Sequence, residues 1–148
     1  MDPSTLITLI TLITLITLDP NLLHPARMTL ARQAFGIYGE DLAVRALERA
    51  GYAVLERRYR VRAGEIDIVA LDGRCLVFVE VKSRQNGRFG GAAVAVTPWK
   101  RRKIVAVATE YLARHRVDAG ACRFDVVTVA SEPDGPRVTI IQNAFDAS

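Results

Sequence analysis

The sequence predicts an α/β domain in which one mixed β-sheet is flanked by helices, in the chain order α-β-β-β-α-β-β. Two segments carry apolar residues at three- and four-residue steps, as in helices, and five short segments are rich in β-branched residues, as in strands. Turn signals such as Asp72-Gly73 separate these segments. The 148 residues correspond to one domain, and 50% hydrophobic content is enough for a core. Strands and helices mixed in this way form a sheet covered by helices.

The first helix is predicted over residues 29–50, because apolar side chains recur on one face and Thr29 can act as its N-cap. Gly36 and Gly39 lower the helix propensity of its first half, so a start near Gly39 is left open. Gly51 follows directly and is a typical helix-ending residue.

The second helix is predicted to begin at Thr97-Pro98, an N-cap followed by a proline in the first turn, and to end near Arg116. Asp72-Gly73 is a two-residue hairpin signal between the second and third strands. The last strand is expected at the edge of the sheet. The five strands are predicted over residues 52–59, 65–71, 75–82, 124–130 and 138–142.

The composition is mildly basic, with 20 Lys and Arg against 16 Asp and Glu and a net charge of +4. This balance suits a phosphate-rich partner but does not identify one. Cys75 and Cys122 stand in no CxxC pair and far from histidines, so we expect small core residues rather than a zinc site. Nothing implies an oxidising compartment, and we expect a cytoplasmic protein.

The N-terminal segment repeats the triplet TLI over residues 5–18. A period of three fits neither a helix nor a half-buried strand, and the run is shorter than the roughly 20 residues that span a membrane. We expect residues 1–27 to be a disordered extension, or one created by a start codon placed before Met28, and residues 28–148 to form the domain. A membrane-associated segment is the less favoured alternative.

Two carboxylates are predicted to meet across the hairpin. Side chains alternate along a strand, and a two-residue turn at Asp72-Gly73 would place Asp67 opposite Phe78 and diagonal to Glu80 on the same side of the sheet. Diagonal Cβ separations of about 7–8 Å allow two carboxylates to share a cation. The alternative is that these strand ends reach solvent, with Glu80 and Lys82 forming an ordinary exposed pair.

Such a site would favour Mg²⁺ or Mn²⁺, because it offers oxygen ligands without a nearby His or Cys. Asp67, Glu80 and the Val81 carbonyl would hold the ion, and positions would remain for water and a phosphate oxygen. Lys82 would position the water or neutralise charge that develops on the phosphate.

Several segments of the sequence are recognisable as a family pattern. The match extends from about Gly36 to Phe145, and its hairpin resembles the core of the PD-(D/E)XK nuclease superfamily. In detail the chain resembles the YraN-like family of small bacterial proteins, relatives of archaeal Holliday-junction resolvases. The matching segments are GEDLAVRALERAGY (39–52), RRYR (57–60), GEIDIVA (64–70), VFVEVKSR (77–84), FG (89–90), AVTPWKRRK (95–103), RFDVV (123–127) and NAF (143–145).

This resemblance implies a restriction-endonuclease-like core, with Asp67 and Glu80 as metal ligands and Lys82 as the catalytic lysine. It also implies that Glu40 completes the active site, although Glu40 alone would pass for a solvated helix residue. Glu65 fits the motif more weakly, as a residue that would support a metal ligand or contact the substrate. Arg58 stands where the family pattern has asparagine. The related resolvases work as dimers, so a homodimer is suggested by analogy alone.

Three basic clusters are candidates for contacts with a nucleic-acid backbone, although any one of them could be a solvated face. They lie on the first strand, after the third strand and at the start of the second helix. No base-reading motif is visible, so we expect recognition of backbone and shape rather than of sequence. The candidate residues are Arg58, Arg60, Arg84, Arg88, Lys100 and Lys103.

The leading prediction is therefore a Mg²⁺- or Mn²⁺-dependent endonuclease that acts on nucleic acid, with DNA, including branched or single-stranded forms, as the expected substrate. A non-catalytic nucleic-acid-binding module is the alternative, and its binding would be sensitive to salt but not to metal. A third reading is a scaffold protein whose carboxylates only form structural ion pairs.

Overall fold

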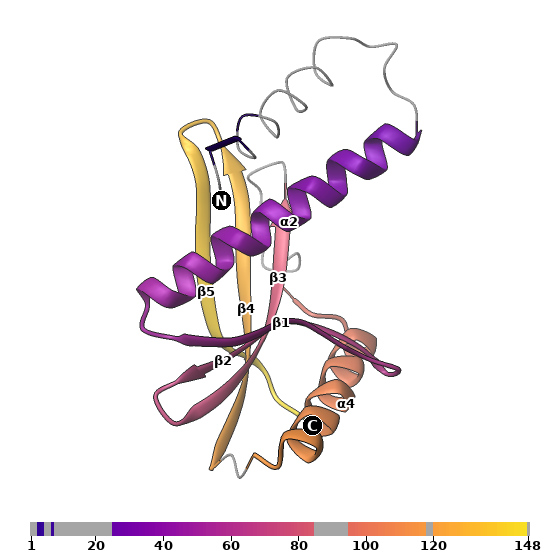
Figure 1. Ribbon diagram of the computed structural model, residues 1–148, viewed down its shortest axis with the longest axis vertical. Helices are drawn as coiled ribbons and strands as arrows, with labels where there is room; N and C mark the ends of the chain where they lie inside the picture. The colour runs from indigo at the N-terminus through magenta and orange to yellow at the C-terminus, as the bar shows by residue number, and fades with distance from the viewer. Residues whose placement is uncertain (1–2, 5–6, 8–24, 85–94, 118–119, 148) are drawn as a thin grey trace.

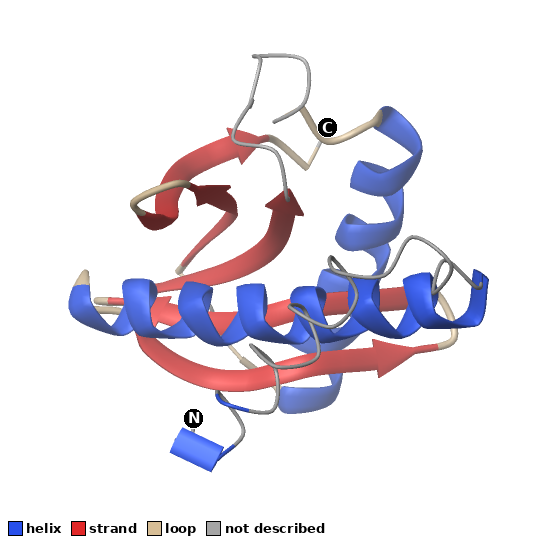
Figure 2. Cartoon of the chain, turned by 90° about the horizontal axis from the view of Figure 1, so that it is seen from above, coloured by secondary structure: helices blue, strands red, loops and turns tan. Residues whose placement is uncertain are grey.

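The computed structural model describes residues 3–4, 7, 25–84, 95–117 and 120–147. In this part of the chain a five-stranded mixed sheet lies between two helices, which confirms the predicted fold class and order of elements. Helix α2 crosses one face of the sheet diagonally, and α4 packs on the other face (Figures 1 and 2). Of the TLI repeat, only Ile7 is described, and Arg88 and the FG motif lie outside the described residues.

The strands follow one another in space in their chain order, β1-β2-β3-β4-β5. Only β3 and β4 are parallel, and α4 connects them; the other neighbours are antiparallel. β3 is therefore the central strand, in keeping with its apolar residues on both faces, and β5 is an edge strand as predicted. The strands are β1 Ala53–Val61, β2 Gly64–Asp72, β3 Cys75–Arg84, β4 Ala121–Glu132 and β5 Gly135–Phe145.

Helix α2 spans Pro25–Arg49, so the predicted start at Thr29 or near Gly39 is wrong. Proline suits the first turn of a helix, where its missing N–H would have no partner. Gly39 does not interrupt the helix but lets it approach the sheet, since a Cβ there would lie 2.0 Å from the Ser83 Oγ. Gly51, with φ 92°, ends the helix as predicted.

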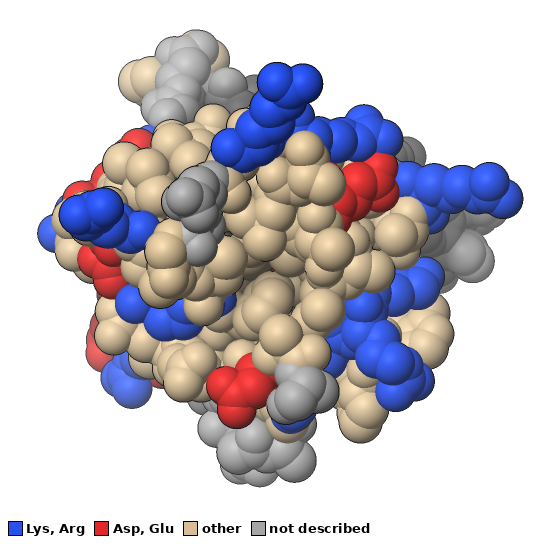
Figure 3. Space-filling model, turned by 90° about the horizontal axis from the view of Figure 1, so that it is seen from below, with Lys and Arg blue, Asp and Glu red and all other residues tan. Residues whose placement is uncertain are grey.

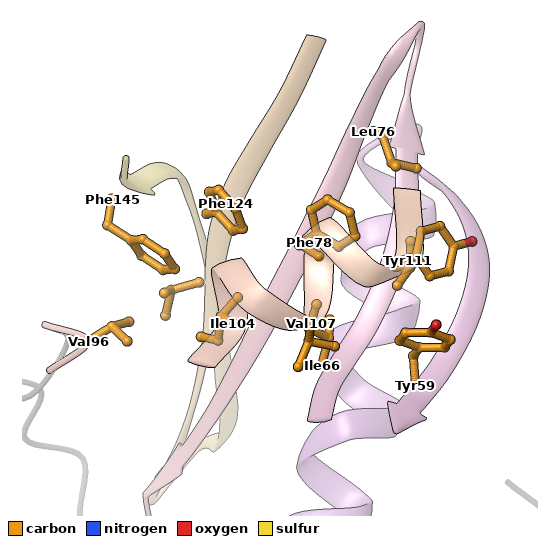
Figure 4. Close-up of a cluster of buried hydrophobic side chains, with 13 residues drawn as sticks. Tyr59, Ile66, Leu76, Phe78, Val96, Ile104, Val107, Tyr111, Phe124 and Phe145 are labelled. Atoms are coloured by element: carbon orange, nitrogen blue, oxygen red, sulfur yellow. The ribbon is translucent and has the colours of Figure 1, made fainter. Parts of the chain in front are cut away.

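Helix α4 spans Pro98–His115, with Thr97 as its N-cap, as predicted. Its buried side chains pack on Phe78, Phe124 and other residues in a cluster rich in aromatic rings (Figure 4). On the other face Ala43 and Leu47 of α2 cover a cluster of strand residues. The two faces of the sheet are thus buried by different helices. The buried residues of α4 are Ile104, Val107, Ala108 and Tyr111.

The prediction that both cysteines are core residues is wrong for Cys122, which is exposed because it precedes the buried part of β4; Cys75 is partly buried. No helix in the described ranges has the length and apolar character needed to cross a membrane.

Candidate functional site

The hairpin register differs by two residues from the prediction. Asp72 pairs with Cys75, so the turn consists of Gly73-Arg74 and Phe78 lies opposite Val69 rather than Asp67. Asp72 belongs to the strand, and its carboxylate lies 2.8 Å from the Arg123 guanidinium. A shift of two residues keeps the side-chain alternation and moves Asp67 toward Glu80 along the hairpin.

Asp67 lies where the β2–β3 ladder ends. The last paired residues are Ile68 and Val79, and beyond them the Asp67 Oδ2 accepts the Val81 N–H at 2.7 Å. A strand N–H points sideways, within the sheet, so this carboxylate occupies the opening between the two strands. The N–H and C=O of one strand residue point to the same side, which directs the Val81 carbonyl into the same opening.

From this position Asp67 interacts with charged groups on both faces of the sheet. Burial raises the pKa of Asp67 to about 7, and the negative charge of Glu80 contributes to the rise. The Val81 hydrogen bond and the Lys100 charge act in the opposite direction, and Glu40 adds a smaller upward effect. Glu40 on α2 and Glu80 on β3 therefore both affect the ionisation of Asp67 on β2.

Glu80 lies on the face of β3 covered by α4, as strand alternation with Phe78 requires. Its Oε1 lies 3.3 Å from the Lys100 Nζ, and its side chain is only 13% exposed. Its Oε2 is buried and makes no hydrogen bond within the described part of the chain. An acceptor left in this way costs free energy, so it marks a position where a further ligand would be favourable.

Lys82 follows Glu80 on the same face of β3. Its Nζ donates to the Ala95 carbonyl at 2.7 Å. Burial lowers the pKa of Lys82 from its ordinary value, against the effect of Glu80, while Arg84 and Lys100 lower it further. A depressed pKa suits a group that takes part in proton transfer near neutral pH.

Glu40 lies on α2, above the opening, where it is 8% exposed. Its carboxylate accepts hydrogen bonds from Arg57 Nε and Arg58 Nε, both at 2.9 Å. Arg57 also reaches Asp41 at 2.6 Å. Glu40 is therefore a buried residue held by two arginines, and not the solvated residue that its sequence context alone indicates.

Arg58 has φ 52°, in the left-handed region, where asparagine is one of the few favourable residues other than glycine. An asparagine, which the resemblance leads us to expect at this position, would fit this backbone conformation. In this chain Arg58 adopts the left-handed conformation despite its steric cost, and its guanidinium forms the second ion pair with Glu40.

An open cavity of about 880 Å³ lies on the α2 side of the sheet. It brings Glu40, Asp67 and Val81 together with three predicted phosphate contacts, Arg58, Arg60 and Arg84. Glu80 and Lys82 are not part of its lining, because they face α4. The candidate site thus spans the sheet at the strand opening. No three His, Cys, Asp or Glu side chains in the described ranges already form a cation cage.

Several of the predicted nucleic-acid contacts carry intramolecular partners. Arg58 and Lys100 bind the site carboxylates, Arg60 pairs with Glu65 at 2.5 Å, and Lys103 lies over the Trp99 ring at 4.2 Å.

On the face drawn in Figure 3, Lys and Arg gather around the margin, and uncharged side chains fill most of the centre. Arg84 is exposed at the cavity.

Sequence reasoning missed two site contacts. It placed Lys100 in a basic surface cluster, whereas the structure places it on Glu80, and it gave no partner to Arg57, which binds Glu40. Both residues belong to clusters of basic side chains that carry the same charge. Only the fold distinguishes the member that points at a carboxylate.

The family model described as "Uncharacterised protein family UPF0102" matches residues 39–129, a range that contains the site carboxylates and Lys82. A UPF0102 protein of Geobacter metallireducens is 45% identical over 119 residues, which cover 80% of this chain and 98% of the relative. One from Symbiobacterium thermophilum is 48% identical over 113 residues, or 76% of this chain and 96% of the relative. A third, from Ralstonia pickettii, is 47% identical over 116 residues, or 76% and 90% of the two chains.

Proposed function

The chain belongs to the uncharacterised protein family UPF0102, the YraN-like group, and on this premise we propose that it is a divalent-metal-dependent endonuclease. It would hydrolyse phosphodiester bonds in nucleic acid, with DNA, including branched or single-stranded forms, as the expected substrate. The proposal rests chiefly on one observation, the Asp67 carboxylate in the strand opening beside Val81, in the electrostatic environment of Glu80.

The donor groups fit a hard dication. Asp67 and Glu80 offer carboxylate oxygens, Val81 directs a carbonyl to the same opening, and the Glu80 Oε2 is buried without a hydrogen-bond partner in the described residues. Oxygen donors of this kind suit Mg²⁺ or Mn²⁺. When bound, such an ion lowers the pKa of a coordinated water and offsets charge on the phosphate.

The other site residues have supporting roles in this proposal. Lys82, with its lowered pKa, exchanges a proton with the attacking water or holds that water in place. Glu40, fixed by its two arginines, faces the same cavity as Asp67 and holds the Arg58 guanidinium there. Arg60 and Arg84 line the cavity and supply cations for backbone phosphates.

One observation favours the alternative, a nucleic-acid-binding module without catalysis. Glu40 and Glu80 already have cationic partners within the chain, so neither needs a metal for charge balance. Such a module would bind nucleic acid equally well with and without metal, and its affinity would fall with salt.

Cleavage assays with matched carboxylate variants distinguish the two functions. Single-stranded, duplex and branched DNA would be incubated with Mn²⁺ and the wild type, Asp67→Asn, Glu80→Gln or Glu110→Gln. Glu110 is the control, because its ion pair is with Arg114 in the same helix and away from the site carboxylates. The proposal expects cleavage that is lost in the first two variants and kept in the control. Cleavage that survives Asp67→Asn or EDTA would refute it.

A further inference from the structure

An ion pair between α4 and the central strand is made by a lysine outside the hairpin motif. Lys100 is in the first turn of α4, and the Thr97 Oγ1 accepts its backbone N–H at 3.3 Å. Its ammonium group lies 3.3 Å from the Glu80 Oε1. The capped helix start therefore fixes the origin of a side chain that ends on a predicted metal ligand.

The lysine of the hairpin motif makes a different contact. Lys82 donates to the Ala95 carbonyl, just before the helix, at 2.7 Å. Glu80 forms its ion pair with Lys100 through Oε1. One oxygen of this carboxylate thus faces the Lys100 ammonium, and the other, Oε2, is buried with no hydrogen bond from the described residues.

We infer that Lys100 is a positioning residue that serves as the internal counter-cation of the carboxylate site, holding Glu80 in place until a dication replaces it there. The inference rests on the proposed function in one respect, namely that Glu80 binds the ion. Both cations are attracted to the same carboxylate, and a carboxylate that is largely removed from water pairs strongly with one of them. Metal binding therefore requires the Lys100 ammonium to release Glu80.

Removal of the ammonium group has two opposite consequences. Without metal, Lys100→Met leaves Glu80 buried beside no cation from α4, so the melting temperature falls. With metal, the competitor is absent, so Mn²⁺ binds more tightly, by about fivefold or more if the coupling is of ordinary size. A residue with a merely structural role would lower stability without raising metal affinity.

Calorimetric titration of Mn²⁺ and thermal unfolding with and without Mn²⁺ test this inference on the full chain. The variants are Lys100→Met, Lys100→Arg and the control Lys103→Met, whose ammonium lies over Trp99 and not on a carboxylate. We expect tighter binding and a larger Mn²⁺-induced rise in melting temperature for Lys100→Met alone. Lys100→Arg keeps the charge and should bind Mn²⁺ as the wild type does.

The outcomes separate this inference from the proposed function. If the wild type binds Mn²⁺ and Lys100→Met binds it no more tightly, the inference is wrong and the metal site stands. If both methionine variants gain affinity equally, general charge is responsible, and the inference is again wrong. If no protein in the series binds Mn²⁺, the proposed function and the inference fall together. Should Lys100→Met not fold, Lys100→Gln replaces it with the same expectations.

Discussion

Replacement of Asp67 by asparagine should change how the stability of the protein depends on pH. Burial and the charge of Glu80 raise the pKa of Asp67 from 3.8 to about 7. Between these values the folded protein keeps a proton that the unfolded chain has released, so the free energy of unfolding falls as pH rises. Asparagine still accepts the Val81 N–H but cannot ionise, so Asp67→Asn removes this part of the pH dependence.

The size of the effect follows from the pKa difference. One pKa unit corresponds to about 1.4 kcal/mol, so the raised pKa of Asp67 lowers the free energy of unfolding by at most about 4 kcal/mol from acidic to neutral pH. The value is an upper limit, because Asp67 and Glu80 titrate together and water relaxes around them. Relative to the wild type, Asp67→Asn should gain about 1 kcal/mol for each pH unit between about pH 5 and pH 7.

Urea unfolding of both proteins across this pH range measures the effect. The difference between them isolates Asp67, because the other titrating groups are common to both. Saturating Mn²⁺ should stabilise the wild type increasingly as pH rises, since the ion binds the ionised carboxylate. Parallel stability curves for the wild type and Asp67→Asn would show that Asp67 is not held protonated in the fold.

Three further substitutions test other parts of the structure, each by chemical unfolding. Gly39→Ala should lower the free energy of unfolding by about 1–3 kcal/mol, because the new methyl group collides with the Ser83 hydroxyl. Adding Ser83→Gly should restore most of this loss, and additive effects of the two substitutions would contradict the close approach. Asp125→Ala should cost about 3–5 kcal/mol, because Asp125 is fully buried and pairs with Arg123 at 2.9 Å; a loss under about 1 kcal/mol would show that the pair is unimportant. Glu40→Gln should lower the free energy of unfolding by only about 1 kcal/mol, since the arginine partners of Glu40 are more than a third exposed. A much larger loss would mean that these ion pairs are stronger than exposed pairs normally are.

The order and type of the elements could be predicted because each has a local signal. The Thr97-Pro98 start of α4 and the end of α2 at Gly51 depend on backbone preferences of single residues and were predicted correctly. The start of α2 was not, because Gly39 lowers helix propensity locally, whereas in the fold its missing side chain lets the helix lie close to Ser83 on a distant strand. A tertiary contact of this kind has no signature in the helix sequence.

The site could be predicted in part. The sequence correctly placed Asp67 and Glu80 near each other along the hairpin despite the shifted turn, because a shift by two residues preserves the side-chain alternation. The expectation that both carboxylates lie on the same side of the sheet is wrong, since Asp67 lines the cavity on the α2 side and Glu80 faces α4. Alternation could not show that Asp67 lies within the sheet opening, since that depends on where the ladder ends. It also could not show that Glu80 meets Lys100, which depends on how α4 packs on the sheet.

The central claim is that Asp67 and Glu80 bind one dication together. Electron paramagnetic resonance of Mn²⁺ counts the free and bound ion directly. We predict one bound Mn²⁺ per chain for the wild type and strongly weakened binding for both Asp67→Asn and Glu80→Gln, with Glu110→Gln unchanged. Undiminished Mn²⁺ binding in either site variant, or no binding by the wild type, would contradict the claim.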